Sequence, residues 1–249
     1  MTREHAPSHA LVLGCGRSGT SIFGELFETL PRYCYASEPE WEQVLATDFS
    51  TPQAIKVPRE PTDGPTDVGL SFAIEDLLAL AEPVEIFWIT RHPYDAVASL
   101  KVGISQNWGH HPRPPDWEDH LHRPLVEKCA YHWAYLNTHG LRSVGNRAHI
   151  VRFEDLIAAP IDFAERVMRI VNAVSKADFD AASQWSARVQ NRNNDAFVEA
   201  KTSREYSRND HIVKVGRWRE NLDDEELSLI RPVVAETADL LGYELPPLR

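Results

Sequence analysis

The sequence predicts an α/β fold in which a central parallel sheet is covered by helices on both faces, and three observations lead to this expectation. An apolar segment at residues 9–14 runs through a glycine-rich turn into an amphipathic helix at about 19–30. The segment 84–90 is apolar nearly throughout, which is typical of a strand inside a sheet. Further strand-like segments are separated by helical patterns, and this alternation favours a parallel sheet whose ligands bind at the carboxyl ends of the strands.

The remaining elements are assigned from hydrophobic periodicity and from capping, glycine and proline residues. Ser37 is expected to cap a helix that carries Pro39 in its first turn, and Glu154 and Asp155 to open a short helix. In chain order we expect strands at 9–14, 33–36, 54–57, 84–90 and 148–153, a loop at 59–69, and helices at 19–30, 70–81, through 96–100, and at 125–143, 161–173, 178–187 and 223–242.

Two segments lack clear periodicity. Residues 103–124 are rich in proline and histidine, and such an insertion is typical of a functional loop or lid. Residues 190–213 are polar and basic, and we expect them to be mobile. No repeat or linker interrupts the order of elements, so a single domain over residues 1–249 is expected.

Composition limits the partners. The 249 residues carry a formal charge of −11, which argues against a general nucleic-acid or membrane-surface binder, and no apolar run is long enough to span a bilayer. Three cysteines give no disulfide framework and indicate a reducing, cytoplasmic location. A polyanionic ligand would therefore need a local basic cluster.

The glycine-rich turn provides the first candidate for such a cluster. Gly14 and Gly19 have the spacing of a Walker loop, but Thr20 stands where that loop has its lysine. A strand–turn–helix unit directs backbone N–H groups at an anion, whereas the missing lysine argues against hydrolysis of ATP or GTP. The alternative is a simple tight turn. Additional phosphate partners would be the Arg17 guanidinium and the hydroxyls of Ser18, Thr20 and Ser21.

Two further basic patterns follow. Arg91 stands at the end of the strand 84–90, and Ser99 lies about two turns into the next helix, so both could reach one phosphate. Lys214 and Arg217 flank Gly216 before the last helix and could hold a second phosphate. Taken singly, each pattern is equally compatible with solvated surface residues.

Together these patterns resemble the sulfotransferases that use 3′-phosphoadenylyl sulfate (PAPS). Gly-x-Gly-Arg-Ser-Gly-Thr-Ser at 14–21 is similar to their 5′-phosphosulfate loop, and Arg-His-Pro-Tyr-Asp-Ala-Val-Ala-Ser at 91–99 to their 3′-phosphate motif. The segment 151–156 resembles a Phe-Glu-Asp-Leu stretch common in the family, and 215–218 its C-terminal Gly-Arg-Trp region. The matches come in family order and cover residues 9–242.

The resemblance implies a P-loop-type three-layer sandwich that binds PAPS and releases its product PAP without a metal. The 5′-phosphosulfate would be held by Gly16, Arg17, Ser18, Gly19, Thr20 and Ser21, and the 3′-phosphate by Arg91 and Ser99, with Lys214, Gly216 and Arg217 close to it. Because this donor has no β/γ-phosphate pair, neither the Walker lysine nor a magnesium ligand is needed.

The same resemblance offers two kinds of base for the acceptor. Aryl and steroid sulfotransferases use a histidine in a Lys-Thr-His segment, but here the comparable position is Pro58. Tyrosylprotein sulfotransferases and several bacterial members place a glutamate after the first helix, which corresponds to Glu38. We therefore expect Glu38 to be the base, with Glu40, His110 and His111 as alternatives. Glu38 could also be only a carboxylate of a helix first turn.

Lys56 is expected to stabilise the leaving phosphate, as the family lysine does, although it could be an ordinary exposed lysine. The histidines 110, 111, 120 and 122 lack the spacing of a metal site. We expect Trp108 and Trp117 to offer flat apolar surface in a lid over the acceptor, whereas Tyr131, Trp133 and Tyr135 pack in the core.

The predicted function is transfer of the sulfuryl group from PAPS to a hydroxyl or amine of an acceptor. The net acidity and the loop 103–124 favour a small molecule or a glycoside over a polyanionic glycan. Two alternatives remain, a P-loop small-molecule kinase or NTPase and a catalytically silent module that binds PAP or PAPS. The acceptor and the oligomeric state stay open.

Overall fold

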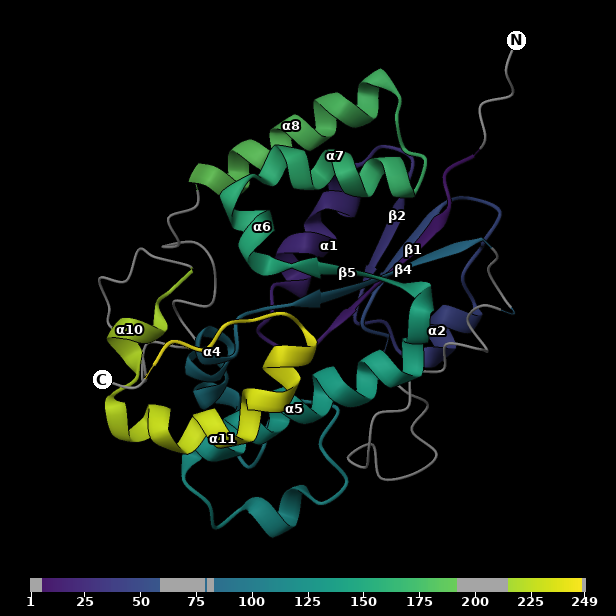
Figure 1. The fold of residues 1–249 in the computed structure, drawn as a ribbon. Coiled ribbons are helices and arrows are strands. Elements are labelled where there is room, and N and C mark those ends of the chain that lie inside the picture. Colours follow the sequence, from purple (N-terminus) through teal and green to yellow (C-terminus); the bar gives the residue numbers. More distant parts are fainter. Residues whose placement is uncertain (1–5, 59–78, 80–82, 192–214, 248–249) are drawn as a thin grey trace.

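The computed structural model describes residues 6–58, 79, 83–191 and 215–247. Within these residues five parallel strands form one sheet in the order β2-β3-β1-β4-β5 (Figure 1). The strands are β1 (His9–Gly14), β2 (Cys34–Ser37), β3 (Gln53–Lys56), β4 (Val84–Thr90) and β5 (Ala148–Arg152).

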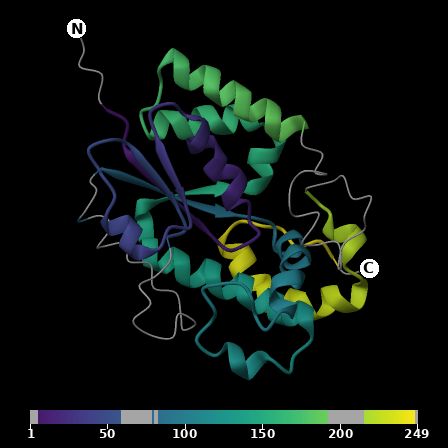
Figure 2. The same cartoon turned by 180° about the vertical axis from the view of Figure 1, so that it is seen from behind.

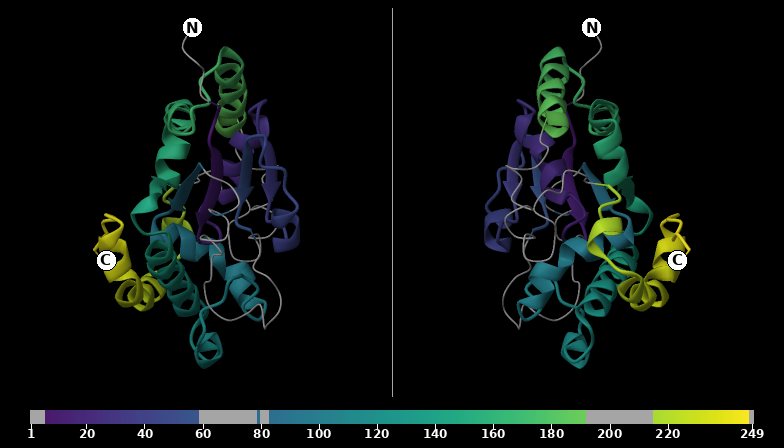
Figure 3. Two further views of the ribbon diagram at one scale, coloured as in Figure 1. Left: turned by 90° about the vertical axis from the view of Figure 1, so that its right-hand side faces the viewer. Right: turned by 90° about the vertical axis from the view of Figure 1, so that its left-hand side faces the viewer.

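Helices cover both faces of this sheet. Figures 1 and 3 show α1, α7 and α8 on one side and α4, α5 and α11 on the other. Within the described residues, no helix is both long and apolar enough to cross a bilayer. The helices are α1 (Thr20–Thr29), α2 (Trp41–Leu45), α4 (Pro93–Ser105), α5 (Leu125–Val144), α6 (Phe153–Ala158), α7 (Pro160–Ile170), α8 (Lys176–Asn191), α10 (Trp218–Asn221) and α11 (Asp224–Leu240), with 3₁₀ turns at Trp117–His120 and Gly145–Arg147.

The central strands bury side chains on both faces. In β1, Ala10 and Val12 join the core beneath α1 and α7, whereas Leu11 and Leu13 face the opposite core with Trp88. Alternate residues of a strand point to opposite faces, so an apolar run is needed wherever helices cover both. The predicted α/β fold with a parallel sheet between two helical layers is confirmed.

The α-helix after β2 departs from the prediction. Ser37 is the last residue of β2 instead of a helix cap, and α2 starts only at Trp41. Glu40 is its N-cap residue and forms a capping box with Gln43. This reciprocal arrangement satisfies backbone N–H groups that Ser37, three residues earlier, cannot reach.

Other boundaries shift slightly or cannot be compared. Helix α4 continues to Ser105, so the predicted loop 103–124 begins inside a helix. The helix expected at 70–81 lies outside the described residues except for its residue 79. Of the basic segment 190–213, residues 190 and 191 end α8 and the remainder lies outside the described residues.

All five strands point their carboxyl ends to one edge of the sheet. Gly14 pairs with Ile89 near the ends of β1 and β4, and Ser37 pairs with Lys56 at the ends of β2 and β3. Figure 2 shows the turn between β1 and α1 close to the start of α4. The residues that follow these strands therefore meet at this edge, where ligands of open α/β sheets bind.

The packing of α5 on β4 depends on a glycine and gives a first prediction. A Cβ atom at Gly140 would lie 1.8 Å from Cη2 of Trp88, whose Nε1 donates to Asn137 Oδ1 at 3.1 Å. We expect Gly140→Ala to lower the free energy of unfolding by about 1–3 kcal/mol, because the methyl group must displace a buried indole or the helix. Urea denaturation measures this change.

The matched control is Ser143→Ala, on the same helix but exposed. Its hydroxyl donates to the His139 carbonyl within the helix. This substitution should change the stability by no more than about 0.5 kcal/mol. Equal stability of the two variants would contradict the proposed close contact.

Candidate functional site

The turn between β1 and α1 is built from residues in left-handed backbone conformations. Arg17 has φ 67° and Gly19 has φ 96°. A Cβ atom at Gly19 would lie 2.4 Å from Cδ2 of Phe153, so only glycine allows this approach. Left-handed residues in a tight turn bring successive N–H groups together, and α1 adds its own N-terminus at Thr20. This geometry suits an anion.

Arg17 joins the two phosphate motifs that the sequence predicted. Its Nε donates to Oγ of Ser99 at 3.1 Å, and its carbonyl accepts from Nη1 of Arg91 at 3.0 Å. The three residues come from the glycine-rich turn, α4 and the end of β4. The structure therefore brings together side chains that lie more than 70 residues apart in the sequence.

Arg91 is almost fully buried at 1% exposure. Its guanidinium carbon lies 4.4 Å from the centre of the Phe153 ring, the same ring that fits against Gly19. Cation–π contact and the bond to the Arg17 carbonyl hold a cation whose burial would otherwise be costly. Arg91 is thus fixed before any ligand arrives.

The hydroxyls of the turn have different surroundings. Ser18 is buried and its Oγ has no hydrogen-bond partner among the described residues. Thr20 is also buried, whereas Ser21 is exposed and its Oγ accepts from Nζ of Lys56 at 3.4 Å. A buried hydroxyl without a partner is costly, and a ligand oxygen would satisfy the one on Ser18.

Glu38 and Lys56 form an ion pair at the carboxyl ends of β2 and β3. Nζ of Lys56 donates to Oε1 of Glu38 at 2.5 Å, and the Glu38 N–H donates to the Lys56 carbonyl at 2.8 Å. The Lys56 side chain is only 3% exposed, whereas that of Glu38 is 48% exposed. The alternative of an exposed surface lysine is therefore wrong, and Glu38 precedes α2 instead of lying in its first turn.

Gly216 and Arg217 lie beside the start of α4. Gly216 has φ 82°, Arg217 is 6% exposed, and the Gly216 N–H donates to Asp95 of α4. Lys214 lies outside the described residues. Two of the three predicted C-terminal residues thus adjoin the helix that carries Ser99.

His110, weighed as an alternative base, fits into a slot between two glycines. Its Nδ1 would lie 3.4 Å from a Cβ atom at Gly16, and its Nε2 only 2.3 Å from one at Gly103. Burial, with a smaller contribution from the Arg17 guanidinium, lowers the pKa of His110 to about 4. His111 is exposed. The imidazole of His110 therefore lies against the glycine-rich turn and is neutral near pH 7.

The two tryptophans of the segment 103–124 are not exposed, so this part of the prediction is wrong. Trp108 is 0% and Trp117 9% exposed, and both belong to the core beneath α4 and α5. Trp108 Nε1 donates to Nδ1 of His132, which is itself fully buried. Of the three aromatic residues assigned to the core, Trp133 is buried, and Tyr131 and Tyr135 pack against it while partly exposed.

Sequence reasoning missed two residues that shape this edge of the sheet, Phe153 and Asp95. Phe153 lay in a recognised segment, but its contact with Gly19 depends on how β5 and α1 meet. Asp95 lay inside the motif at 91–99, and a charged residue in a helix with a mostly apolar pattern was the available signal. The described residues hold no group of three or more His, Cys, Asp or Glu that could bind a metal ion.

The position of His110 against the glycine-rich turn predicts acid lability. The unfolded chain binds a proton at a pKa of about 6.5, whereas the folded chain does so only at about 4. Between these values the unfolded state holds more protons, so the free energy of unfolding falls as the pH drops from 6.5 to 4. We expect this residue to contribute a slope of up to about 1.4 kcal/mol per pH unit.

His110→Asn should make the pH dependence shallower by that amount, as measured by urea denaturation from pH 7 to pH 4.5. A cavity left by the shorter side chain lowers stability at every pH, so the slope and not the midpoint carries the information. An unchanged slope would contradict a His110 that stays neutral in the folded chain.

Solved structures of similar fold are sulfotransferases. The chain matches the sulfotransferase domain from the curacin biosynthetic pathway over 97% of its own length and 100% of that chain, with a TM-score of 0.52 and 14% identity. It matches mouse sulfotransferase SULT7A1 complexed with PAP over 96% of its own length and 88% of that chain, with a TM-score of 0.55 and 10% identity. It matches sulfotransferase STF9 from Mycobacterium avium over 97% of its own length and 78% of that chain, with a TM-score of 0.52 and 15% identity.

The sequence itself gives no comparable match. No family model matches it, and no curated protein does so either. Identities of 10–15% show the architecture alone. With its parallel five-stranded sheet in the described residues and helices on both faces, the chain has the P-loop-type fold of the sulfotransferases.

Proposed function

We propose that this chain transfers a sulfuryl group from PAPS to a hydroxyl or amine of a small acceptor and releases PAP. One observation carries the proposal: Arg17, Ser99 and Arg91 form one hydrogen-bonded group at the carboxyl edge of a sheet with the sulfotransferase fold. One of the structures with this fold was solved with PAP. Two arginines and a helix N-terminus at one place suit a ligand with two separate anionic groups.

The residues of the edge fit such a ligand. The unpartnered Oγ of Ser18 can donate to a phosphate oxygen, and α1 begins two residues later, at Thr20, with the N–H groups of its first turn. These groups with Arg17 would hold the 5′-phosphosulfate. Arg91 and Ser99 would hold the 3′-phosphate, with Gly216 and Arg217 beside them and Lys214 on the preceding stretch of chain.

The absence of the Walker lysine supports this choice of donor over a nucleoside triphosphate. Thr20 offers a hydroxyl where the lysine would neutralise β- and γ-phosphates. Arg17 supplies a positive charge from within the turn instead, and its Nε already contacts Ser99 of the second phosphate motif. The Arg17 guanidinium thus lies between the two motifs. This position suits a ligand that carries phosphate groups on the 3′ and 5′ positions of one ribose.

Glu38 and Lys56 are the proposed catalytic pair for the acceptor. Lys56 binds Oε1 of Glu38, and among the described residues Oε2 accepts no hydrogen bond, so that oxygen can take the proton of the acceptor. The acceptor oxygen or nitrogen then forms a bond to sulfur while the bond from sulfur to the 5′-phosphate oxygen breaks. Lys56 and Arg17 would stabilise the charge that develops on this oxygen.

The class of acceptor rests on charge. Because Trp108 and Trp117 are buried, they do not support the expected aromatic surface over the acceptor. A formal charge of −11 still disfavours a polyanionic glycan. A small hydroxylated molecule or glycoside remains the proposed acceptor.

Ligand-dependent thermal unfolding tests the donor. At about 100 times its Kd, PAP should stabilise the chain by about 2.7 kcal/mol, which raises Tm by roughly 5–10 °C for a chain of this size. 5′-AMP, which lacks the 3′-phosphate, should stabilise it much less at the same concentration. Stabilisation by ATP with Mg²⁺ but not by PAP would favour a kinase or NTPase, whereas PAP binding without sulfate transfer from labelled PAPS to any acceptor would favour a silent module.

Substitution of the proposed base tests the acceptor half. Glu38→Gln keeps the shape of the side chain but removes the proton acceptor, so kcat should fall by about 10²–10⁴-fold. The Kd for PAP, measured by calorimetry, should change less than about twofold, since this group does not hold the donor phosphates.

Glu40→Gln is the matched control. Glu40 lies two residues further along as the N-cap of α2, and glutamine can retain the capping bond. This variant should keep nearly the activity of the unaltered chain. Activity retained in Glu38→Gln, or lost only in Glu40→Gln, would contradict the assignment.

A further inference from the structure

A buried carboxylate on α4 lies outside the set of residues that are proposed to hold the donor. Asp95 is 1% exposed and lies in the first turn of the helix. Its Oδ2 accepts the N–H of Gly216 at 2.6 Å, and its Oδ1 accepts the N–H of Trp218 at 2.9 Å. Both oxygens are thus used by the backbone on either side of Arg217.

Two charge-assisted hydrogen bonds are a strong attachment for the segment that leads into the short helix α10. Backbone N–H groups stabilise a buried carboxylate, and in turn the carboxylate fixes both peptide groups. Side chains reinforce the attachment, because the Trp218 ring stacks on His92 at 6.3 Å and meets the edge of Tyr94 at 5.2 Å. The segment 216–218 therefore has one position on α4.

This position has a consequence for ligand binding. Asp95 and Ser99 are four residues apart on α4, so their side chains share one face of the helix. Ser99 binds Arg17 on that face, and Asp95 binds both neighbours of Arg217. The backbone of Arg217 is thereby fixed one helical turn from Ser99, and its side chain is 6% exposed.

We propose that Asp95 is the positioning residue for recognition of the 3′-phosphate: by anchoring residues 216–218 on α4, it holds Arg217 beside Ser99 and makes the chain select 3′-phosphorylated adenylates. The inference rests on the proposed function. Asp95 does not touch the ligand itself. A carboxylate near a phosphate would repel it, and the two backbone N–H groups that occupy its oxygens reduce this repulsion.

The test compares the Kd of PAP with that of 5′-AMP by calorimetry. Asparagine at position 95 can accept only one of the two N–H bonds and faces the other with its own NH₂ group. Asp95→Asn should weaken PAP binding by about 10- to 100-fold, the equivalent of a lost hydrogen bond to a charged group. Binding of 5′-AMP should change less than about twofold, so the selectivity between the two ligands falls.

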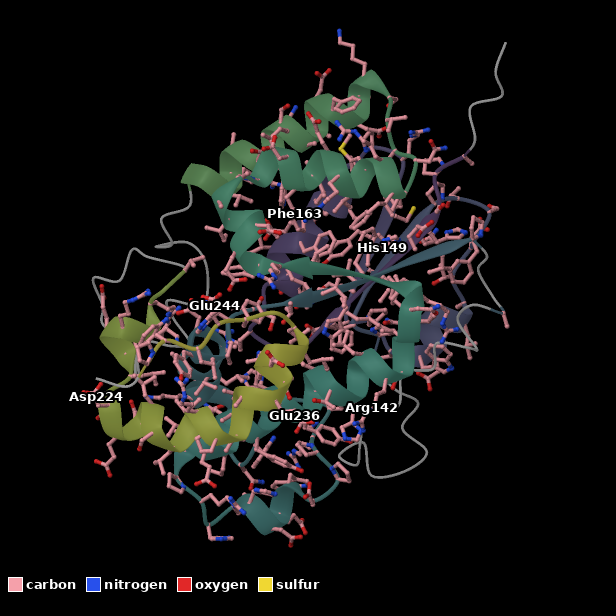
Figure 4. The ribbon with its side chains drawn as sticks, in the orientation of Figure 1. Arg142, His149, Phe163, Asp224, Glu236 and Glu244 are labelled. Carbon is pink, nitrogen blue, oxygen red and sulfur yellow. The ribbon has the colours of Figure 1, made fainter. Side chains whose placement is uncertain are left out.

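Lys101→Met is the matched control for loosened packing. Lys101 also joins α4 to the C-terminal region, through the Asn221 carbonyl at 3.2 Å and Glu226 at 2.6 Å. These contacts lie on α10 and on α11, which starts at Asp224 (Figure 4). The substitution should lower the stability but leave the ratio of the two Kd values unchanged.

Two further measurements test the proposal if Asp95→Asn does not fold. Asp95→Ser, whose hydroxyl can accept one N–H bond without presenting a clashing NH₂ group, should show the same selective loss. In the unaltered chain, PAP should slow hydrogen exchange of the amides of residues 216 and 218, measured by NMR, and 5′-AMP should not.

The outcomes separate the two levels of the argument. If the unaltered chain does not prefer PAP over 5′-AMP, the proposed function fails. If it prefers PAP but Asp95→Asn loses both ligands equally or keeps its selectivity, the positioning role is wrong. Equal protection of residues 216 and 218 by both ligands would also overturn it.

Discussion

The contact between Phe153 and Gly19 is the constraint on which the carboxyl edge of the sheet, the proposed donor site, depends. The ring occupies the space that a side chain at position 19 would need, and its face lies 4.4 Å from the Arg91 guanidinium. Phe153 is itself anchored in the core under α7, at 2% exposure. One buried ring thus sets the distance between the glycine-rich turn and the end of β4, which explains why Arg91 can reach the Arg17 carbonyl at 3.0 Å.

The second feature of this edge is the number of charges that it buries. Lys56, Arg91, Asp95 and Arg217 are each less than 9% exposed, in a chain whose formal charge is −11. Burying a charge is costly unless a partner is fixed beside it. The partners of Lys56 and Asp95 are Glu38 and two backbone N–H groups, so much of this cost is met within the chain. A polyanionic ligand of this acidic chain would need a local basic cluster. The basic side chains at this edge, Lys56, Arg91 and Arg217, are buried.

Sequence patterns located the strands and predicted the residues that are proposed to bind the donor, because both kinds of pattern follow from short-range rules. A strand covered on two faces must be apolar, as β4 is, and a turn with φ 96° at Gly19 needs glycine. Arg91 and Ser99 were singled out from their positions at the end of a strand and about two turns into the next helix. The contacts that join them to Arg17 could not be predicted, because these contacts depend on how α4 packs against the glycine-rich turn.

The errors have the opposite origin. Trp108 and Trp117 lie in an irregular segment, where no periodicity tells a buried ring from an exposed one, and the structure buries both. Ser37 is a good capping residue by type, yet pairing of β2 with β3 extends the strand through it. In both cases a tertiary contact decided between local conformations of similar energy.

Lys56 connects the two halves of the proposed reaction. Its Nζ contacts Oγ of Ser21, in the first turn of α1, and Oε1 of Glu38, the proposed base. A buried ammonium between these groups has little freedom, because the side chain is 3% exposed and comes from a strand with paired neighbours. Lys56, at the end of β3, thus orients the proposed base Glu38 and also contacts Ser21 of the proposed donor site.

In the proposed reaction, that arrangement would hold the half-exposed carboxylate of Glu38 at a fixed place. Glu38 itself follows β2 with φ 52°, and its N–H is bonded to the Lys56 carbonyl. The carbonyl and Nζ of Lys56 therefore hold the N–H and Oε1 of Glu38. These two bonds set the position of Oε2 before an acceptor binds.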